Sequence, residues 1–429
     1  MEQKSHAPNP AGRILMASLV GTTIEFFDFY IFSTAAVLVF PRLFFPAADP
    51  TAATLESLAT FALAFFARPV GAVIFGHFGD RIGRKATLVA ALLTMGPSTV
   101  AIGLLPTYHA IGVAAPILLA LFRFGQGLGL GGEWGGAVLL ATENAPEGKK
   151  AWYGMFPQLG APIGFLLSSA TFLVLSKTLS NEEFFAYGWR IPFIASALLV
   201  WIGLYVRLKL TETPDFLRTL AKNERVRLPM GVVITKHTRR LLLGTFMAIT
   251  TFLFFYIMTV FTLSWGTSAL HYDRSGFLSS QLVTVLFFAL GIPVSARLAD
   301  QYGRNTILIA ATAAILVFGM FFSHLFSGGS WPVTFVFLAL GMLLMGITYG
   351  PLGTALAEIF PTAVRYTGAS LSFTLAGIFG ASLAPYLATT IAGKYGLAYV
   401  GYYLSVAAGL TLASLMLARP VMTTSAQEG

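Results

Sequence analysis

Five ionisable side chains lie in stretches of the sequence that are otherwise apolar: Glu25, Asp28, Arg68, Arg123 and Glu133. Such stretches suit a lipid bilayer, in whose middle a charged group costs at least about 2.5 to 3.5 kcal/mol, so each of these residues needs a compensating role. Buried carboxylates can take up and release protons, whereas arginines stay charged and bind anions. The five residues therefore indicate a site that binds an anion and exchanges protons.

Glu25 and Asp28 are the first candidates for proton binding. They lie near the middle of the apolar stretch 14–39, and a spacing of three residues puts them on one face of a helix. Two carboxylates this close in a medium of low dielectric repel each other, and loss of water disfavours their charged forms. We expect at least one of them, Asp28 before Glu25, to bind the proton. The alternative is a permanent ion pair with Arg68 or Arg123 of a neighbouring helix.

Arg123 is the first candidate for anion binding. Gln126 follows it by one helical turn on the same face, and together they form a set of donors that suits the carboxylate of a substrate. Because arginine keeps its charge, it needs an anion in every state, either a substrate or one of the two carboxylates of the first helix. A substrate that displaced such a carboxylate would leave it to take up a proton. Arg68 lies closer to the end of its stretch, where a structural ion pair competes with substrate binding.

Glu133 is a third candidate for proton binding. It lies ten residues after Arg123, in a segment with glycines at positions 127, 131, 132, 135 and 136. Glycines spaced by four residues are typical of helices that pack closely in membranes. The alternative for Glu133 is a structural ion pair with Arg68.

The elements that position these residues are membrane helices. Hydrophobic residues make up 56% of the 429 residues and charged residues only 10%, whereas soluble domains contain about 25%. A membrane span needs about 20 mostly apolar residues. Twelve stretches qualify: 14–39, 54–76, 86–105, 112–141, 152–175, 190–208, 241–268, 276–296, 305–326, 332–356, 367–392 and 396–418. The sequence predicts an all-α membrane protein with twelve transmembrane helices, the first of them uncleaved.

The charges of the connectors predict the topology. Most of the 27 Lys and Arg residues fall in connectors on one side, which also carries both termini, and cytoplasmic loops carry such an excess. The net charge of +9 therefore indicates membrane orientation and not nucleic-acid binding. We expect a six-helix half at 1–208, a cytoplasmic linker with short amphipathic helices at 209–240, and a second six-helix half at 241–429.

Two polar motifs occur once in each half. The loop Gly76-His-Phe-Gly-Asp80-Arg-Ile-Gly83-Arg84-Lys has a weaker copy at 296–305, in which Asp300, Gly303 and Arg304 stand 220 residues after their counterparts. The second motif follows the fourth and tenth spans at an offset of 215 residues: Glu143, Pro146 and Lys150, then Glu358, Pro361 and Arg365. Two motifs with nearly the same offset indicate an internal repeat.

Together with Glu212-Thr-Pro after the sixth span, these motifs resemble those of the major facilitator superfamily. The segments 21–30, 68–71 and 123–136 are similar to its metabolite:H⁺ symporter family, which includes carriers of shikimate, α-ketoglutarate, citrate, proline and betaine. The resemblance implies that Asp80 meets the amino end of the eleventh helix when the cytoplasmic side is closed.

The resemblance also implies a conformational latch, made by Gly76, Asp80, Gly83, Arg84, Glu143, Asp300 and Arg304. The copy at 296–305 departs from the pattern, with Ala296 in place of the first glycine and Gln301 in place of the first basic residue. These departures leave the strength of the second latch open, but not the fold. The alternative to a latch is a plain topological loop with a helix cap.

The second half contains no charged residue near the middle of a span, so we expect it to shape the cavity with hydroxyl, amide and aromatic groups. Tyr256 and Gln281 are its candidates for substrate binding, with packing as the alternative.

The sequence thus predicts a monomeric proton-coupled symporter of the bacterial inner membrane that imports a small polar carboxylate or zwitterion by alternating access. The alternatives are a proton-independent facilitator or exchanger, and a nutrient sensor that does not transport. With no cysteine and no ligand spacing among the histidines, we expect no metal or cofactor. No pattern of a nucleophile with a base or of a nucleotide loop indicates an enzyme.

Overall fold

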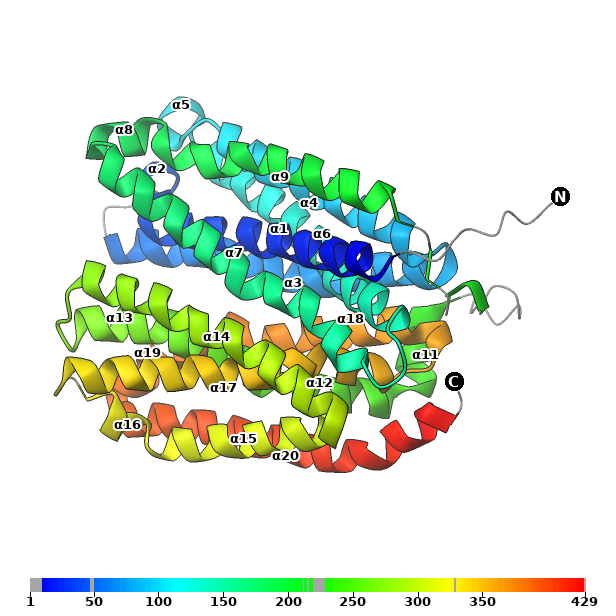
Figure 1. Ribbon diagram of the computed structural model, residues 1–429. Helices are drawn as coiled ribbons and strands as arrows, with labels where there is room; N and C mark the ends of the chain where they lie inside the picture. The colour runs from blue at the N-terminus through cyan, green and yellow to red at the C-terminus, as the bar shows by residue number, and fades with distance from the viewer. Residues whose placement is uncertain are drawn as a thin grey trace.

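The computed structural model describes residues 10–46, 50–210, 212–213, 216–218, 228–327 and 329–427. Every regular element in these ranges is helical, and Figure 1 shows the helices running roughly parallel in a bundle. The first half comprises α1 (Ala11–Leu38), α2 (Phe40–Leu43), α3 (Pro50–Arg81), α4 (Arg84–Leu104), α5 (Tyr108–Ile111), α6 (Ala114–Glu143), α7 (Lys150–Thr178), α8 (Asn181–Ala186), η1 (Gly188–Arg190) and α9 (Ile191–Leu208).

The connector and the second half continue the bundle. Their elements are α11 (Pro229–Lys236), α12 (Thr238–Tyr256), η2 (Ile257–Phe261), α13 (Thr262–Ser268), α14 (Arg274–Tyr302), α15 (Arg304–Met320), α16 (Phe322–Leu325), α17 (Trp331–Glu358), η3 (Thr362–Val364), α18 (Arg365–Gly377), η4 (Ile378–Ser382), α19 (Ala384–Tyr395) and α20 (Leu397–Gln427).

The lengths of these helices confirm the all-α membrane fold. Within the described ranges, eleven helical stretches are long and apolar enough to cross a membrane, and α15 is a shorter apolar helix of 17 residues. The sequence predicts the ninth span over 305–326, but α15 ends at Met320 and the rest of that stretch turns into α16.

Both halves begin and end at the same side of the bundle. In Figure 1 the start of α1 and the end of α20 lie on the right, with α1 to α9 in the upper part of the view and α12 to α20 in the lower part. We call the side with the two chain ends the terminal end and the opposite side the far end. The loops between α3 and α4 and between α14 and α15, which carry the repeated motif, lie at the terminal end.

Glycines set the close approach of α3 to α6 and fix the position of Arg68. A Cβ atom at Gly131 would collide with the backbone carbonyl oxygen of Arg68, so only glycine lets the two helices meet there. The second half repeats this contact between α14 and α17, where a Cβ at Gly346 would collide with the carbonyl oxygen of Phe288. Glycine-lined contacts of this kind are typical of membrane helices.

The connector between the halves is partly described. Residues 211, 214–215 and 219–227, where the sequence predicts part of the amphipathic linker, lie outside the described ranges, whereas α11 is one of the expected short helices. Glu212 caps the start of α4, because its Oε1 accepts from the amide of Arg84 at 2.9 Å and its Oε2 from the amide of Lys85 at 3.2 Å. Gly83, with φ +116°, has no room for a Cβ beside this carboxylate. The start of the connector is thus bound to the loop between α3 and α4.

Candidate functional site

A small cavity lies between the two halves. Its volume is about 30 Å³, which holds little more than water. The first half contributes Phe26, Phe29, Tyr30, Arg68 and Ala161, and the second half contributes Thr251, Phe252, Phe255, Tyr256, Phe288, Met345, Tyr349 and Phe373. Among these lining residues Arg68 alone carries a charge. A metabolite can therefore enter only when the halves move apart.

Arg68 pairs with Glu25 at the cavity wall. The Nη2 atom of Arg68 lies 3.7 Å from Oε1 of Glu25, and both side chains are buried. The guanidinium also lies 5.0 Å from the ring centre of Phe29 and 5.6 Å from that of Phe65. Neither carboxylate oxygen of Glu25 accepts a hydrogen bond from any residue that the structure describes. Among the described residues, the ion-pair partner of Glu25 is thus an arginine that itself faces the cavity.

Asp28 lies in a different environment from Glu25. Its Oδ1 accepts a hydrogen bond from Ser196 at 2.5 Å and its Oδ2 accepts one from Thr99 at 2.9 Å, so two hydroxyl groups from α9 and α4 satisfy it. The Thr99 hydroxyl in turn accepts a bond from Nε2 of Gln126 at 2.7 Å. Asp28 therefore belongs to a polar chain inside the first half.

Arg123 forms the other end of this chain. Its Nη1 donates to Oε1 of Gln126 at 3.0 Å, which completes the sequence Arg123, Gln126, Thr99, Asp28. The guanidinium is fully buried, with Cζ 4.0 Å from the ring centre of Phe32 and 4.7 Å from that of Phe29. No carboxylate among the described residues forms an ion pair with it, and its Nε and Nη2 atoms have no hydrogen-bond acceptor there. Arg123 lies behind Phe29, which itself lines the cavity.

Glu133 pairs with Arg207 and not with Arg68, the partner that the sequence suggested. The Nη2 atom of Arg207 contacts Oε1 of Glu133, and its Nη1 donates to the carbonyl of Leu88 at 3.0 Å. Sequence reasoning missed Arg207 because it ends the sixth span and resembles an ordinary connector cation. A signal for its burial was Gly203, which lies one turn earlier on the buried face of α9.

The two candidates of the second half are in different places. Tyr256 lines the cavity. Gln281 does not; its Nε2 donates to the carbonyl of Thr259 at 2.7 Å, within the π-helical turn η2. A π-helical turn leaves carbonyl groups unpaired, and Gln281 satisfies one of them.

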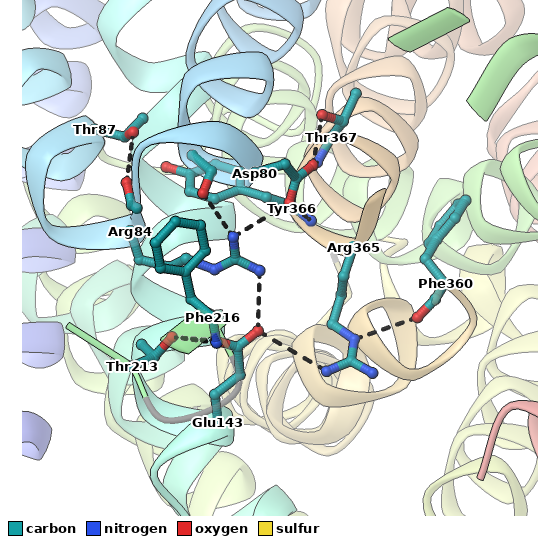
Figure 2. Close-up of polar contacts among 12 residues, drawn as sticks. Asp80, Arg84, Thr87, Glu143, Thr213, Phe216, Phe360, Arg365, Tyr366 and Thr367 are labelled. Atoms are coloured by element: carbon teal, nitrogen blue, oxygen red, sulfur yellow. Dashed lines mark hydrogen bonds and ion pairs between the residues drawn. The ribbon is translucent and has the colours of Figure 1, made fainter. Parts of the chain in front are cut away.

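The seven residues proposed for the latch lie at the terminal end of the bundle, in two separate contacts between the halves. Figure 2 shows Asp80 against the start of α18, where its Oδ1 accepts from the amide of Tyr366 at 3.3 Å and its Oδ2 from the amide of Thr367 at 3.1 Å. The hydroxyl of Thr367 also donates to Oδ2 at 2.8 Å. Gly76 permits this contact, because a Cβ there would lie 2.9 Å from Cα of Thr367. An anion at the amino end of a helix is stabilised by its free amides and dipole.

Ion pairs surround this contact. Arg84 lies 3.3 Å from both Oδ1 of Asp80 and Oε1 of Glu143. The same oxygen of Glu143 lies 3.9 Å from Nη1 of Arg365 in the other half, as Figure 2 shows, and its Oε2 accepts a bond from Thr213 of the connector at 2.6 Å. Glu143 thus contacts both halves and the connector.

The second copy of the loop makes an equivalent contact. Asp300 accepts hydrogen bonds from the amides of Ala151 at 2.9 Å and Trp152 at 2.8 Å, at the start of α7. Arg304 lies 3.8 Å from Asp300 and 3.3 Å from Glu358. This copy keeps the two amide bonds of the first but lacks a hydroxyl donor like that of Thr367, and the substituted positions 296 and 301 take no part in either contact.

Comparison with known proteins agrees with this arrangement. A family model described as sugar (and other) transporter matches residues 14–230. The chain is 56% identical to the inner membrane metabolite transport protein YhjE of Escherichia coli K12, over 97% of this chain and 96% of the relative. It is 35% identical to the shikimate transporter of the same organism, over 89% of this chain and 88% of the relative.

The fold is also similar to solved structures. The proton:xylose symporter XylE of the major facilitator superfamily, bound to 6-bromo-6-deoxy-D-glucose, superposes with a TM-score of 0.77. The sequence identity is 15%, and the match covers 95% of this chain and 94% of the other. The helical bundle, the repeated loops and the relatives together show that this chain belongs to the major facilitator superfamily, in the sugar (and other) transporter family, and is a membrane transporter of metabolites.

Proposed function

We propose that this protein is a proton-coupled symporter that imports a small metabolite carrying a carboxylate. The observation that carries the proposal is the Arg68–Glu25 pair, in which the single charged side chain lining the cavity is neutralised by a buried acid. An arginine at a cavity wall can bind a substrate carboxylate through two parallel hydrogen bonds. Glu25 would then lose its ion-pair partner.

The replacement of Glu25 by the substrate carboxylate at Arg68 couples substrate binding to proton uptake. When a substrate carboxylate binds Arg68, Glu25 remains buried without its ion-pair partner and without a hydrogen-bond donor among the described residues. Such a carboxylate is unstable in low dielectric and takes up a proton. One negative charge and one proton enter together, so the charge of the site stays constant. The contacts favour Glu25 over Asp28 as proton carrier, because Asp28 keeps its two hydroxyl donors.

Arg123 and Asp28 are the ends of a hydrogen-bonded chain beside the cavity. The chain from Arg123 through Gln126 and Thr99 holds the guanidinium beside Phe29, where it raises the positive potential behind the cavity wall. A cation buried without a carboxylate attracts an anionic group. Arg123 therefore favours a negatively charged end on the substrate, next to Arg68.

The cavity walls favour a substrate with an apolar or alkylammonium body. Aromatic rings dominate the walls, and their polar groups are few: Arg68, Thr251 and the hydroxyls of Tyr30, Tyr256 and Tyr349. A sugar would need many more hydrogen-bonding partners. Aromatic faces accommodate apolar groups and attract quaternary ammonium groups. The substrate class is therefore a compact carboxylate or zwitterion.

We infer that the terminal end faces the cytoplasm and that the structure is closed on that side. The excess of basic connectors at this end supports the orientation. The contacts of Asp80 with α18 and of Asp300 with α7 support the closure, because each joins the two halves. Import then requires both contacts to break while the far end closes.

Uptake into proteoliposomes tests the proposal. The purified protein receives a pool of radiolabelled shikimate, benzoate and glycine betaine, with and without an inside-alkaline pH gradient. We expect accumulation that needs the gradient. Glu25→Gln imitates a permanently protonated acid, so it should exchange substrate across the membrane without accumulating it, while Asp28→Asn should keep the gradient dependence with weaker uptake.

Glu182→Gln, an exposed acid at the far end, is the matched control and should behave as wild type. Equal uptake with and without the gradient in wild type would contradict symport and leave a facilitator. Gradient-driven accumulation by Glu25→Gln would move the proton site to another residue.

A further inference from the structure

The buried ion pair between Glu133 and Arg207 is not explained by substrate binding. Neither residue lines the cavity, and both side chains are at most 2% exposed. Arg207 occupies Oε1 of Glu133, whereas Oε2 has no hydrogen-bond partner among the described residues. Glu133 thus has one oxygen in the ion pair and one oxygen without a hydrogen-bond partner among the described residues.

The guanidinium of Arg207 packs against α1 at a glycine. A Cβ at Gly21 would collide with its guanidinium, so the glycine is needed for the arginine to pack there. Gly21 lies one helical turn before Glu25 on the same face of α1, on the side of the terminal end. Arg207 and Glu133 therefore lie between the acid at the cavity and the terminal end.

The charged and titratable groups around Glu133 come from several helices. Glu25 of α1 interacts electrostatically with Glu133, with Arg207 of α9 and with Arg68 of α3. Tyr366 of α18 also interacts with Glu133 and donates its hydroxyl hydrogen to the carbonyl of Gly132 at 2.5 Å. Glu25 and Asp28, both of α1, are the carboxylate neighbours of Glu133. Asp28 is held by the hydroxyls of Thr99 and Ser196, so a proton that leaves Glu25 toward the terminal end meets Glu133.

The same segment of α6 forms part of the closure between the halves. Trp134 stacks on Phe373 of α18, with ring centres 3.5 Å apart and planes at 6°. Its Nε1 donates to Gln158 at 2.8 Å, and Gln158 donates to the carbonyl of Tyr349 at 2.8 Å. Residues 132–134 therefore combine an acid with contacts that must change when the terminal end opens.

We propose that Glu133 is the proton-release carboxylate of the carrier and that Arg207 is its positioning residue. The inference rests on the proposed proton symport. After the substrate leaves, the O–H bond of Glu25 breaks and an O–H bond forms on Oε2 of Glu133. Glu25 becomes a carboxylate again and pairs with Arg68, and Glu133 passes the proton to water at the opened terminal end. Arg207 positions Glu133 and favours its ionised form, so the proton passes on to water and does not stay on Glu133.

Three variants in proteoliposomes test this proposal: Glu133→Gln, Arg207→Gln and the double variant. The probe is the same radiolabelled pool of shikimate, benzoate and glycine betaine. Two rates are measured, accumulation driven by the pH gradient and exchange of internal for external substrate. Exchange does not require the site to lose its proton, so we expect it to continue in Glu133→Gln and in the double variant, while accumulation is lost in both.

Arg207→Gln leaves a buried acid without its cation and is prone to misfold, so the double variant, which carries no unpaired charge, decides the question. Accumulation at the wild-type level in the double variant would overturn the proposal and make the pair structural. Arg190→Gln is the control, because Arg190 bonds the carbonyls of Gly103 and Leu105 near the far end. If wild type itself accumulates nothing under a gradient, the proposed symport fails, which is a different result from normal accumulation in the double variant.

Discussion

Arg68 and Glu25 stabilise each other at the wall of the cavity, and removing one of them should cost more than removing both. Arg68→Gln leaves Glu25 buried with no ion-pair partner and no hydrogen-bond donor among the described residues. Loss of one partner of a buried ion pair costs about 3 to 5 kcal/mol. We expect Arg68→Gln to lower the melting temperature in detergent clearly, and Arg68→Gln with Glu25→Gln to restore most of it without restoring uptake.

Arg42→Gln is a suitable control for the melting experiment, because Arg42 contacts the ring of Phe185 near the far end and lies away from the cavity. A single Arg68→Gln variant as stable as wild type would show that Glu25 is neutral in this state. The replacement of Glu25 by the substrate carboxylate at Arg68 would then not describe the coupling.

The sequence predicted the functional candidates where a charged residue lies in an apolar span, because a charge there has a high free-energy cost. Glu25, Arg68 and Arg123 are conspicuous because charges are rare inside apolar spans. Arg207 was not, since a cation at the last turn of a span also suits the membrane surface; Lys209, two residues later, is exposed as expected. Periodicity alone does not show which of two neighbouring cations turns inward to meet an acid on another helix.

At the scale of helices, the contact of α3 with α6 sets where Arg68 lies. Gly131→Ala would push the helices apart at the carbonyl of Arg68, and such overpacking costs about 1 to 3 kcal/mol. We expect this variant to melt at lower temperature and to take up substrate more slowly, with the loss in affinity larger than the loss in maximal rate. Gly409→Ala is the matched control, because a Cβ there meets no atom within 4 Å. Equal effects of the two substitutions would contradict this role.

Helices were predictable from hydropathy, but their irregular turns were not. The sequence places spans over 241–268 and 367–392, and the structure interrupts both with a π-helical turn, η2 and η4. Such turns depend on side chains from other helices, as Gln281 shows by donating to the carbonyl of Thr259. For this reason a polar residue that seemed suited to bind substrate instead satisfies the backbone of its neighbour.

For the whole molecule, the orientation can be tested with single cysteines, since the chain contains none of its own. Lys149 is exposed at the terminal end and Glu182 is exposed at the far end. In intact cells a membrane-impermeant maleimide should label Glu182→Cys and leave Lys149→Cys unlabelled until the cells are opened. The reverse pattern would place the terminal end outside and overturn the proposed direction of import.

The two latches should set the balance between the closed and open forms of the terminal end. Asp80→Asn keeps the size of the side chain but removes the charge that the amides of Tyr366 and Thr367 stabilise. A hydrogen bond to a charged group contributes about 1.5 to 3 kcal/mol. The open form should therefore become more populated. Thr354→Cys reports this change, because Thr354 is fully buried and its hydroxyl lies 3.3 Å from the carbonyl of Lys150 in the other half.

In membranes opened to the reagent, we expect maleimide to label Thr354→Cys several times faster when Asp80→Asn is present, and Asp300→Asn to act in the same direction because it frees the amides of Ala151 and Trp152. Glu147→Gln, an exposed acid in the same region, should leave the rate unchanged. If only Asp80→Asn accelerates labelling, the two contacts differ in free energy by more than the one additional hydroxyl bond that Thr367 donates to Asp80 suggests. Ala296 and Gln301 of the second loop would then affect the free energy of the open form, in which neither aspartate contacts its helix.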